Sequence, residues 1–288
     1  MRKHTTFRFT IYGWALGLAV SFFALGIHGC KKNPRSTLSI EVRSPLIFKT
    51  DKEVILESSA HDLAKEVRPQ NISLYDLHYL TNKNYLAFPF VSVLQTVYGQ
   101  SISDSKELSL VFRATDGYEA VINTSRFNEG QAFLAFQDLD HSGWSALPNH
   151  GGETAGPYYL VWEDTINTAQ KGFPWPWAIE EIIMVNRDLR YKAIVPDSSI
   201  TNNDIDQGFD IFMSRCTSCH ALDGYGGTIG PDLNSPQNIL TYRTEHMVRE
   251  MILHPSKYRT GKMPDFVDLK GESLDHLISY LSYLRDRE

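Results

Sequence analysis

The placement of three cysteines constrains this chain of 288 residues more than any other feature of its sequence. Cys216 and Cys219 are separated by two residues and are followed directly by His220, whereas Cys30 lies shortly after an N-terminal apolar run. Three cysteines are too few for a disulfide scaffold of this size. The fold must therefore depend on apolar side chains, which make up 42% of the residues and suffice for one large or two modest cores.

The segment Cys216-Thr217-Ser218-Cys219-His220 has the C-x-x-C-H spacing of c-type haem attachment. Two thiols this close can add to the two vinyl groups of one porphyrin, and the adjacent imidazole then reaches the iron as an axial ligand. A redox pair would lie in a βαβ setting, zinc would need two more ligands nearby, and a disulfide leaves His220 unexplained. The sequence therefore predicts one covalent haem c on Cys216 and Cys219, with His220 on the iron.

Residues 204–288 resemble a class I cytochrome c domain. The resemblance rests on Gly208 and Phe212 before the first cysteine, the G-P-x-L segment 230–233, the methionine loop 261–264 and a closing helix around 277–281. In that family the proline carbonyl of the G-P-x-L segment accepts a hydrogen bond from the axial histidine. The resemblance implies an all-α domain that transfers electrons and has both axial positions filled by protein.

Met263 is the predicted second axial ligand. It precedes a proline and so lies on a non-helical loop, where its thioether is free to point at the iron. Met247 and Met251 are four residues apart on an amphipathic helix, which is typical of core side chains. The alternatives for this position are His246 and His254, and His254 is also expected to end its helix.

Residues 1–29 are predicted to be a signal peptide of the lipoprotein type. Basic residues precede the apolar run 9–27, and the segment 27–30 resembles the lipobox of bacterial lipoproteins, with Cys30 as the lipidated cysteine. His28 departs from that pattern, and an uncleaved membrane anchor is the alternative. Both interpretations place the remainder on the periplasmic side of a bacterial membrane, and they leave inner and outer membrane open.

The charge balance excludes two classes of partner. The whole chain has 28 basic and 34 acidic residues, and removal of residues 1–29 takes away three of the basic ones and none of the acidic ones. An acidic surface gives no support for a nucleic-acid partner or for direct adhesion to anionic lipid. We therefore expect contact with the membrane only through the N-terminal lipid.

Period-two runs between the tether and the cysteine pair predict a β-rich α+β domain. The expected strands are 38–42, 107–112, 118–122, 132–136 and 158–162, and the expected helices are 74–79 and 90–98. Asp116-Gly117 favours a type I′ hairpin turn, and Ser273 is the expected N-cap of the last helix. The predicted order is tether 30–37, β-rich domain 38–195, linker 196–203 and all-α cytochrome domain 204–288.

Four short segments of the middle region are similar to sulfite-oxidase-like molybdopterin-binding domains. They are 115–122, 133–140, 147–152 and 156–162. Those enzymes hold molybdenum through a cysteine thiolate, and this chain has no cysteine between Cys30 and Cys216. The similarity therefore implies the fold without the metal, and we expect a docking or assembly module. Residues 138–143 also match the start of an EF-hand loop, but a polar turn is the favoured interpretation.

These features predict a membrane-tethered monohaem c-type cytochrome that relays single electrons between redox proteins, and not an enzyme. The expected partners are a dehydrogenase or an oxidase, and a molybdenum enzyme is one candidate. Two alternatives stay open. One is an oxidoreductase whose middle domain binds a substrate or pterin and passes electrons to the haem. The other is a redox or ligand sensor in which Met263 is labile.

Overall fold

The computed structural model describes residues 44–99, 105, 107–148, 150–197, 199, 202–258, 261 and 263–287. All of these residues belong to one compact unit, 40–288. The predicted signal peptide, Cys30, the tether and the expected strand 38–42 lie outside them. Within the described ranges, no helix has the length and apolar character needed to cross a lipid bilayer.

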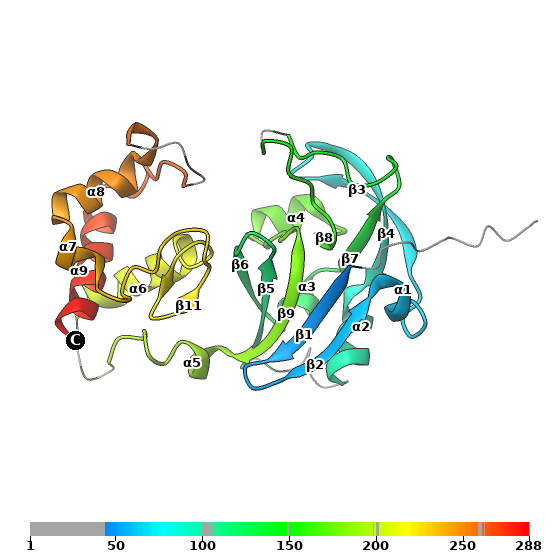
Figure 1. Ribbon diagram of the computed structural model, residues 1–288, viewed down its shortest axis with the longest axis horizontal. Helices are drawn as coiled ribbons and strands as arrows, with labels where there is room; N and C mark the ends of the chain where they lie inside the picture. Colours follow the sequence, from blue (N-terminus) through cyan, green and yellow to red (C-terminus); the bar gives the residue numbers. More distant parts are fainter. Residues whose placement is uncertain are drawn as a thin grey trace, which may run out of the picture. The chain divides into compact units, whose positions relative to one another are not determined.

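Two β-sheets form the first part of the described chain (Figure 1). One has the strand order β2-β1-β9-β5-β6, and the other has the order β3-β4-β7-β8. Neighbouring strands are antiparallel except β1 and β9, which run parallel. The strands are β1 (Pro45–Thr50), β2 (Val54–Ser59), β3 (Gln70–Asp76), β4 (Thr81–Pro89), β5 (Leu108–Ala114), β6 (Glu119–Asn123), β7 (Ala132–Asp138), β8 (Tyr159–Trp162) and β9 (Ile179–Asn186).

The main hydrophobic core takes side chains from both sheets and is rich in aromatic rings. Phe88 of β4 stacks on Phe136 of β7 with ring centroids 4.5 Å apart, and Phe112 of β5 is fully buried in the same core. The helices of this part are α1 (Ala60–Leu63), α2 (Phe90–Tyr98), α3 (Arg126–Glu129), α4 (Thr165–Gln170) and α5 (Arg187–Arg190). The predicted β-rich α+β architecture is confirmed.

Local predictions for this part are mostly correct, with one wrong helix. The expected strands 107–112, 118–122, 132–136 and 158–162 are β5 to β8, and the expected helix 90–98 is α2. The expected helix 74–79 is instead the end of β3 followed by a turn. The carboxylate of Asp76 accepts hydrogen bonds from the backbone N–H groups of His78 and Tyr79, which closes the turn into β4.

The loop between β5 and β6 is a hairpin, but its turn is not of type I′. Gly117 has a φ of 89°, whereas Asp116 is not among the described residues with positive φ. The N–H of Gly117 donates to the carbonyl of Ala114 at 3.0 Å, and the N–H of Ala114 donates to that of Tyr118 at 2.9 Å. The hairpin therefore has a three-residue loop that ends in a left-handed glycine.

The second part of the described chain is mostly helical. Its elements are α6 (Asn203–Arg215), β10 (Ala221–Leu222), β11 (Tyr225–Gly226), α7 (Ile239–Tyr242), α8 (Glu245–Leu253), the short 3₁₀ helix η1 (Pro255–Lys257) and α9 (Glu272–Asp286). The N-cap of α9 is Gly271 with a φ of 64°, so the expected cap Ser273 lies inside the helix. A helical domain after a β-rich one is confirmed.

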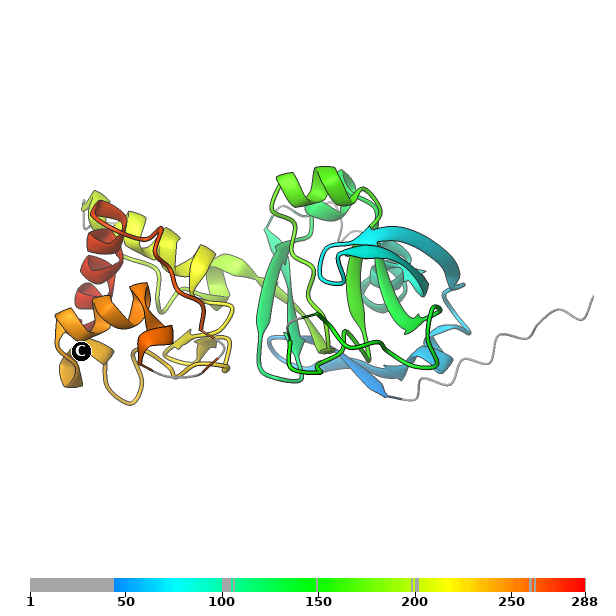
Figure 2. The same cartoon turned by 90° about the horizontal axis from the view of Figure 1, so that it is seen from above.

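Helices α6 and α9 pack side by side at a glycine (Figure 1, Figure 2). A Cβ atom on Gly208 would lie 2.1 Å from the carbonyl oxygen of His276, closer than atoms can approach. The buried rings of Phe212 and Tyr280 pack against one another beside this contact. Gly208 therefore allows the two helices to approach closely enough for these rings to meet.

The hydrophobic core of the helical part begins before α6. Tyr191 and Ile194 are 1% and 0% exposed and belong to the same cluster as Phe212 and Tyr280. The hydroxyl of Tyr280 donates to the carbonyl of Ile194 at 2.7 Å. The chain that leaves the β-rich part is therefore held against the helical part before the expected linker 196–203 is reached.

We expect Gly208→Val to lower the free energy of unfolding by about 1–3 kcal/mol, because the added side chain meets the backbone of α9. Gln207→Val is the matched control, since it places the same side chain on the exposed face of α6. Denaturant unfolding followed by circular dichroism measures both. Equal stability of the two variants would contradict the close approach of α6 and α9.

Candidate haem-binding site

The predicted site residues Cys216, Cys219 and His220 lie in one tight backbone turn at the end of α6. The carbonyl of Cys216 accepts the N–H of Cys219 at 3.0 Å and the N–H of His220 at 2.9 Å. Both cysteines are partly buried. The turn therefore brings the two thiols and the imidazole into the proximity that the spacing of the motif predicts.

The imidazole of His220 is oriented by one hydrogen bond. Its Nδ1 lies 2.8 Å from the carbonyl oxygen of Pro231. A carbonyl only accepts, so Nδ1 carries the proton and Nε2 keeps its lone pair. Burial lowers the pKa of His220, which favours the neutral ring. A neutral imidazole with a protonated and bonded Nδ1 is the form that binds a metal through Nε2.

The segment that carries Pro231 is fitted closely to the imidazole ring. A Cβ atom on Gly230 would lie 2.2 Å from Cε1 of His220, and the N–H of Gly230 donates to the carbonyl of Cys219 at 2.8 Å. A glycine is therefore needed where the backbone passes the ring. This arrangement agrees with the hydrogen bond that the resemblance to class I cytochromes c implies.

The surroundings of the cysteine pair suit an apolar macrocycle. Cys216 packs against the hydrophobic cluster that contains Phe212 and Leu222. Burial raises the pKa of the Cys216 thiol to about 12, as expected for a sulfur among apolar groups. Two thiols and an oriented imidazole beside an apolar cluster are the donor set and the environment that haem c requires, so the residues present fit this group.

The predicted second axial ligand lies on a different segment. Met263 is on the irregular loop between η1 and α9, and it is partly buried. Met247 on α8 is 45% exposed, so the prediction that it is a core side chain is wrong. The buried residue of that helix is Val248. His254 ends α8 as its C-cap. His246 is exposed.

The acidic segment 138–143 does not form a calcium loop. Asp138 is fully buried and accepts from the Nζ of Lys83 at 2.7 Å, and Asp140 accepts from the side chain of Asn84. The ammonium group of Lys83 therefore occupies the position beside Asp138 and Asp140 that a calcium ion would need. Across the residues that the structure describes, no three or more His, Cys, Asp or Glu side chains are grouped as a metal site.

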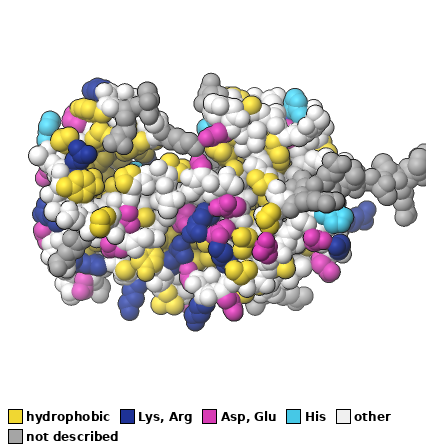
Figure 3. Space-filling model, viewed as in Figure 1, with side chains coloured by type: hydrophobic (Ala, Val, Ile, Leu, Met, Phe, Trp, Pro, Cys, Tyr) yellow, Lys and Arg dark blue, Asp and Glu magenta, His cyan; other side chains and the backbone are white. Residues whose placement is uncertain are grey.

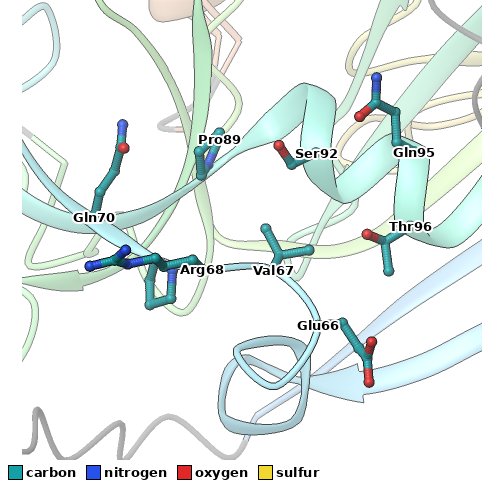
Figure 4. Close-up of a pocket in the computed structure, with 9 residues that line it drawn as sticks. Glu66, Val67, Arg68, Gln70, Pro89, Ser92, Gln95 and Thr96 are labelled. Carbon is teal, nitrogen blue, oxygen red and sulfur yellow. The ribbon is translucent and has the colours of Figure 1, made fainter.

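The β-rich part has a surface pocket of about 810 Å³ that is separate from the cysteine pair. It lies between the start of β3, the end of β4 and α2, and the side chains of Arg68, Gln70 and Gln95 line it (Figure 4). None of the predicted site residues contributes to it.

Sequence reasoning missed a contact between the β5–β6 hairpin and the C-x-x-C-H turn. The N–H of Glu119 donates to the carbonyl of Ser218 at 2.9 Å, and the N–H of Thr228 donates to the carbonyl of Gly117 at 2.8 Å. These are backbone bonds between segments about 100 residues apart. A pattern of residue types carries no signal for such a pairing.

Comparison with known proteins identifies the helical part. Residues 203–281 match the family model described as "Cytochrome C oxidase, cbb3-type, subunit III". Two curated relatives are "Cbb3-type cytochrome c oxidase subunit CcoP" of Helicobacter pylori and its counterpart in Helicobacter pylori strain 52. They are 35% and 33% identical over 88 residues, which is 28% of this chain. The chain spans 30% of the length of these relatives. The helical part is a cytochrome c domain, which implies covalently bound haem c.

We expect Gly230→Ala to lower the free energy of unfolding of the haem-loaded protein by about 1–3 kcal/mol, because the new methyl group must displace the His220 ring. Denaturant unfolding monitored at the main haem absorption band measures this. Gln237→Ala, at an exposed position of the same loop region, is the control and should leave stability unchanged. A Gly230→Ala protein as stable as this control would contradict the close contact between Gly230 and the His220 ring.

Proposed function

We propose that the chain is a membrane-tethered monohaem c-type cytochrome that relays single electrons between redox proteins on the periplasmic side of a bacterial membrane. In this proposal Cys216 and Cys219 hold the porphyrin covalently, and His220 and Met263 are the axial ligands. The observation that carries it is the His220 imidazole, whose Nδ1 is used by Pro231 while Nε2 is left to bind iron.

The proposed ligand pair favours electron transfer over chemistry on a small substrate. Bound haem c supplies a one-electron couple at the iron. A thioether from Met263 would stabilise the ferrous state relative to a second imidazole and so raise the reduction potential. If His220 and Met263 both bind the iron, no coordination position would be left open for oxygen or peroxide. This is the reason to propose a relay and not an oxidase or peroxidase.

The N-terminal part of the proposal concerns attachment to the membrane. Lipid on Cys30 and the polar tether 30–37 would hold the body at the membrane surface, and the acidic charge of the remainder favours attachment through the lipid alone. The β-rich part would act as a docking or assembly module. An oxidase is the favoured redox partner, because the two curated relatives are named as oxidase subunits, and a dehydrogenase is the second choice.

We expect Met263→Ala to abolish the weak near-infrared sulfur-to-iron band of the oxidised protein, because that band needs a thioether on the iron. The reduced variant should also bind carbon monoxide without denaturant, since one axial position is opened. Visible and near-infrared spectra of the purified protein measure both properties. Met247→Ala is the matched control, because this methionine is 45% exposed on α8, and its spectra should equal those of the wild type.

The spectra of the variant and of the wild type together decide whether Met263 binds the iron. A near-infrared band that persists in Met263→Ala would show that another residue binds the iron. A wild-type protein that binds carbon monoxide readily would contradict the relay and would support the sensor alternative.

A further inference from the structure

The β5–β6 hairpin is bonded to the residues that lie between the two cysteines. Its N–H at Glu119 donates to the carbonyl of Ser218, the residue directly before Cys219, at 2.9 Å. On the other side of the turn, the N–H of Gly227 donates to the carbonyl of Thr217 at 2.8 Å. Both residues between the cysteines therefore accept a backbone hydrogen bond, and one of the two donors, Glu119, belongs to the β-rich part.

The hairpin is shaped for this contact. A Cβ atom on Gly117 would lie 2.2 Å from Oγ1 of Thr228, and the φ of Gly117 is 89°. The positive φ favours glycine at this end of the hairpin loop, and the lack of a side chain leaves room for Thr228. The hydroxyl of the next residue, Tyr118, forms a hydrogen bond with the Ser218 side chain, and burial raises the pKa of this phenol. A protonated, buried hydroxyl thus reinforces the backbone bonds.

The same hairpin brings a buried carboxylate to the edge of the haem-attachment turn. Glu119 is 2% exposed, and its Oε1 accepts from Nε and Nη2 of Arg113 at 2.9 and 2.7 Å. Its Oε2 has no hydrogen-bond partner and lies 3.7 Å from Nη2 of Arg190. The carboxylate therefore lies between two guanidinium groups, and it is shielded from water.

These three side chains belong to a row of charges across the five-stranded sheet. Arg113 also donates to Glu181 at 2.6 Å, and Arg190 donates to Asp51 at 2.7 Å. Glu181 in turn accepts from Lys49, so the row contains three positive and three negative side chains. Figure 3 shows basic and acidic side chains gathered over this sheet. Glu119 is the member of this row whose backbone is bonded to the turn.

We propose that the β-rich part sets the reduction potential of the haem, through the Glu119 carboxylate that the β5–β6 hairpin places between Arg113 and Arg190 at the haem-attachment turn. This inference rests on the proposed function, because it requires haem on Cys216 and Cys219. Glu119 and Arg190 are positioning residues in this role, since they act on the redox centre through their charge and not by contact with the iron.

The sign of the effect follows from electrostatics. Reduction adds one negative charge at the redox centre, so a nearby carboxylate opposes it and a nearby guanidinium favours it. Glu119→Gln removes a negative charge and should raise the midpoint potential. Arg190→Gln removes a positive charge and should lower it. For partly shielded charges of this kind we expect the ratio of reduced to oxidised protein at fixed potential to change about fivefold in each case.

The experiment is a spectroscopic redox titration of the full-length, haem-loaded protein. Glu119→Gln and Arg190→Gln are compared with the wild type and with two controls that remove exposed charges, Glu57→Gln on β2 and Arg187→Gln on α5. Shifts of opposite sign in the two variants and none in the controls support the proposal. Unchanged potentials, or shifts of the same sign, would overturn it. Damage to the structure alone would shift the potential in the same direction whether a negative or a positive charge is removed.

Hydrogen exchange of the wild type and of one charge-conserving variant tests the contact independently of the potentials. We expect slow exchange at the amides of Glu119 and Thr228, and faster exchange across 216–228 in Tyr118→Phe, which keeps every charge. Rapid exchange of both amides in the wild type would overturn the inference. A polypeptide that retains no haem would overturn the proposed function itself, whereas retained haem with unshifted potentials would overturn this inference alone.

Discussion

The hydrogen bond from His220 to the Pro231 carbonyl is the interaction on which the site depends. It fixes the protonated nitrogen of the ring, and it leaves the other nitrogen to a metal. The bond exists because Gly230 lets the backbone pass the ring closely and because the turn after α6 ends at His220. The orientation of the His220 ring is thus determined by a backbone carbonyl.

The position of this turn depends on packing that begins outside the cytochrome domain. Gly208 lets α6 approach α9, and Tyr191 and Ile194 complete the core that these helices share. The β5–β6 hairpin then contributes two backbone hydrogen bonds to the surroundings of the turn. The cytochrome c domain of this chain is therefore bonded to its β-rich neighbour at the turn that carries Cys216 and Cys219.

Sequence reasoning predicted what short-range patterns can encode. The proximity of Cys216, Cys219 and His220, the hydrogen bond at the G-P-x-L segment, helix 90–98 and the β-rich character of the middle region agree with the structure. One error arises from a single polar contact, at Asp76, whose carboxylate closes a turn where a helix was expected. The contact of Glu119 with Ser218 could not be predicted, because it joins distant segments through backbone atoms that every residue type possesses.

The most direct test of the account is the haem content of the purified polypeptide after it has been denatured and washed with acidified acetone. That solvent removes haem that is not covalently bound. The account predicts one haem per chain that stays with the protein, and loss of this haem in the double variant Cys216→Ala, Cys219→Ala. A colourless wild-type polypeptide would contradict covalent attachment at these two cysteines.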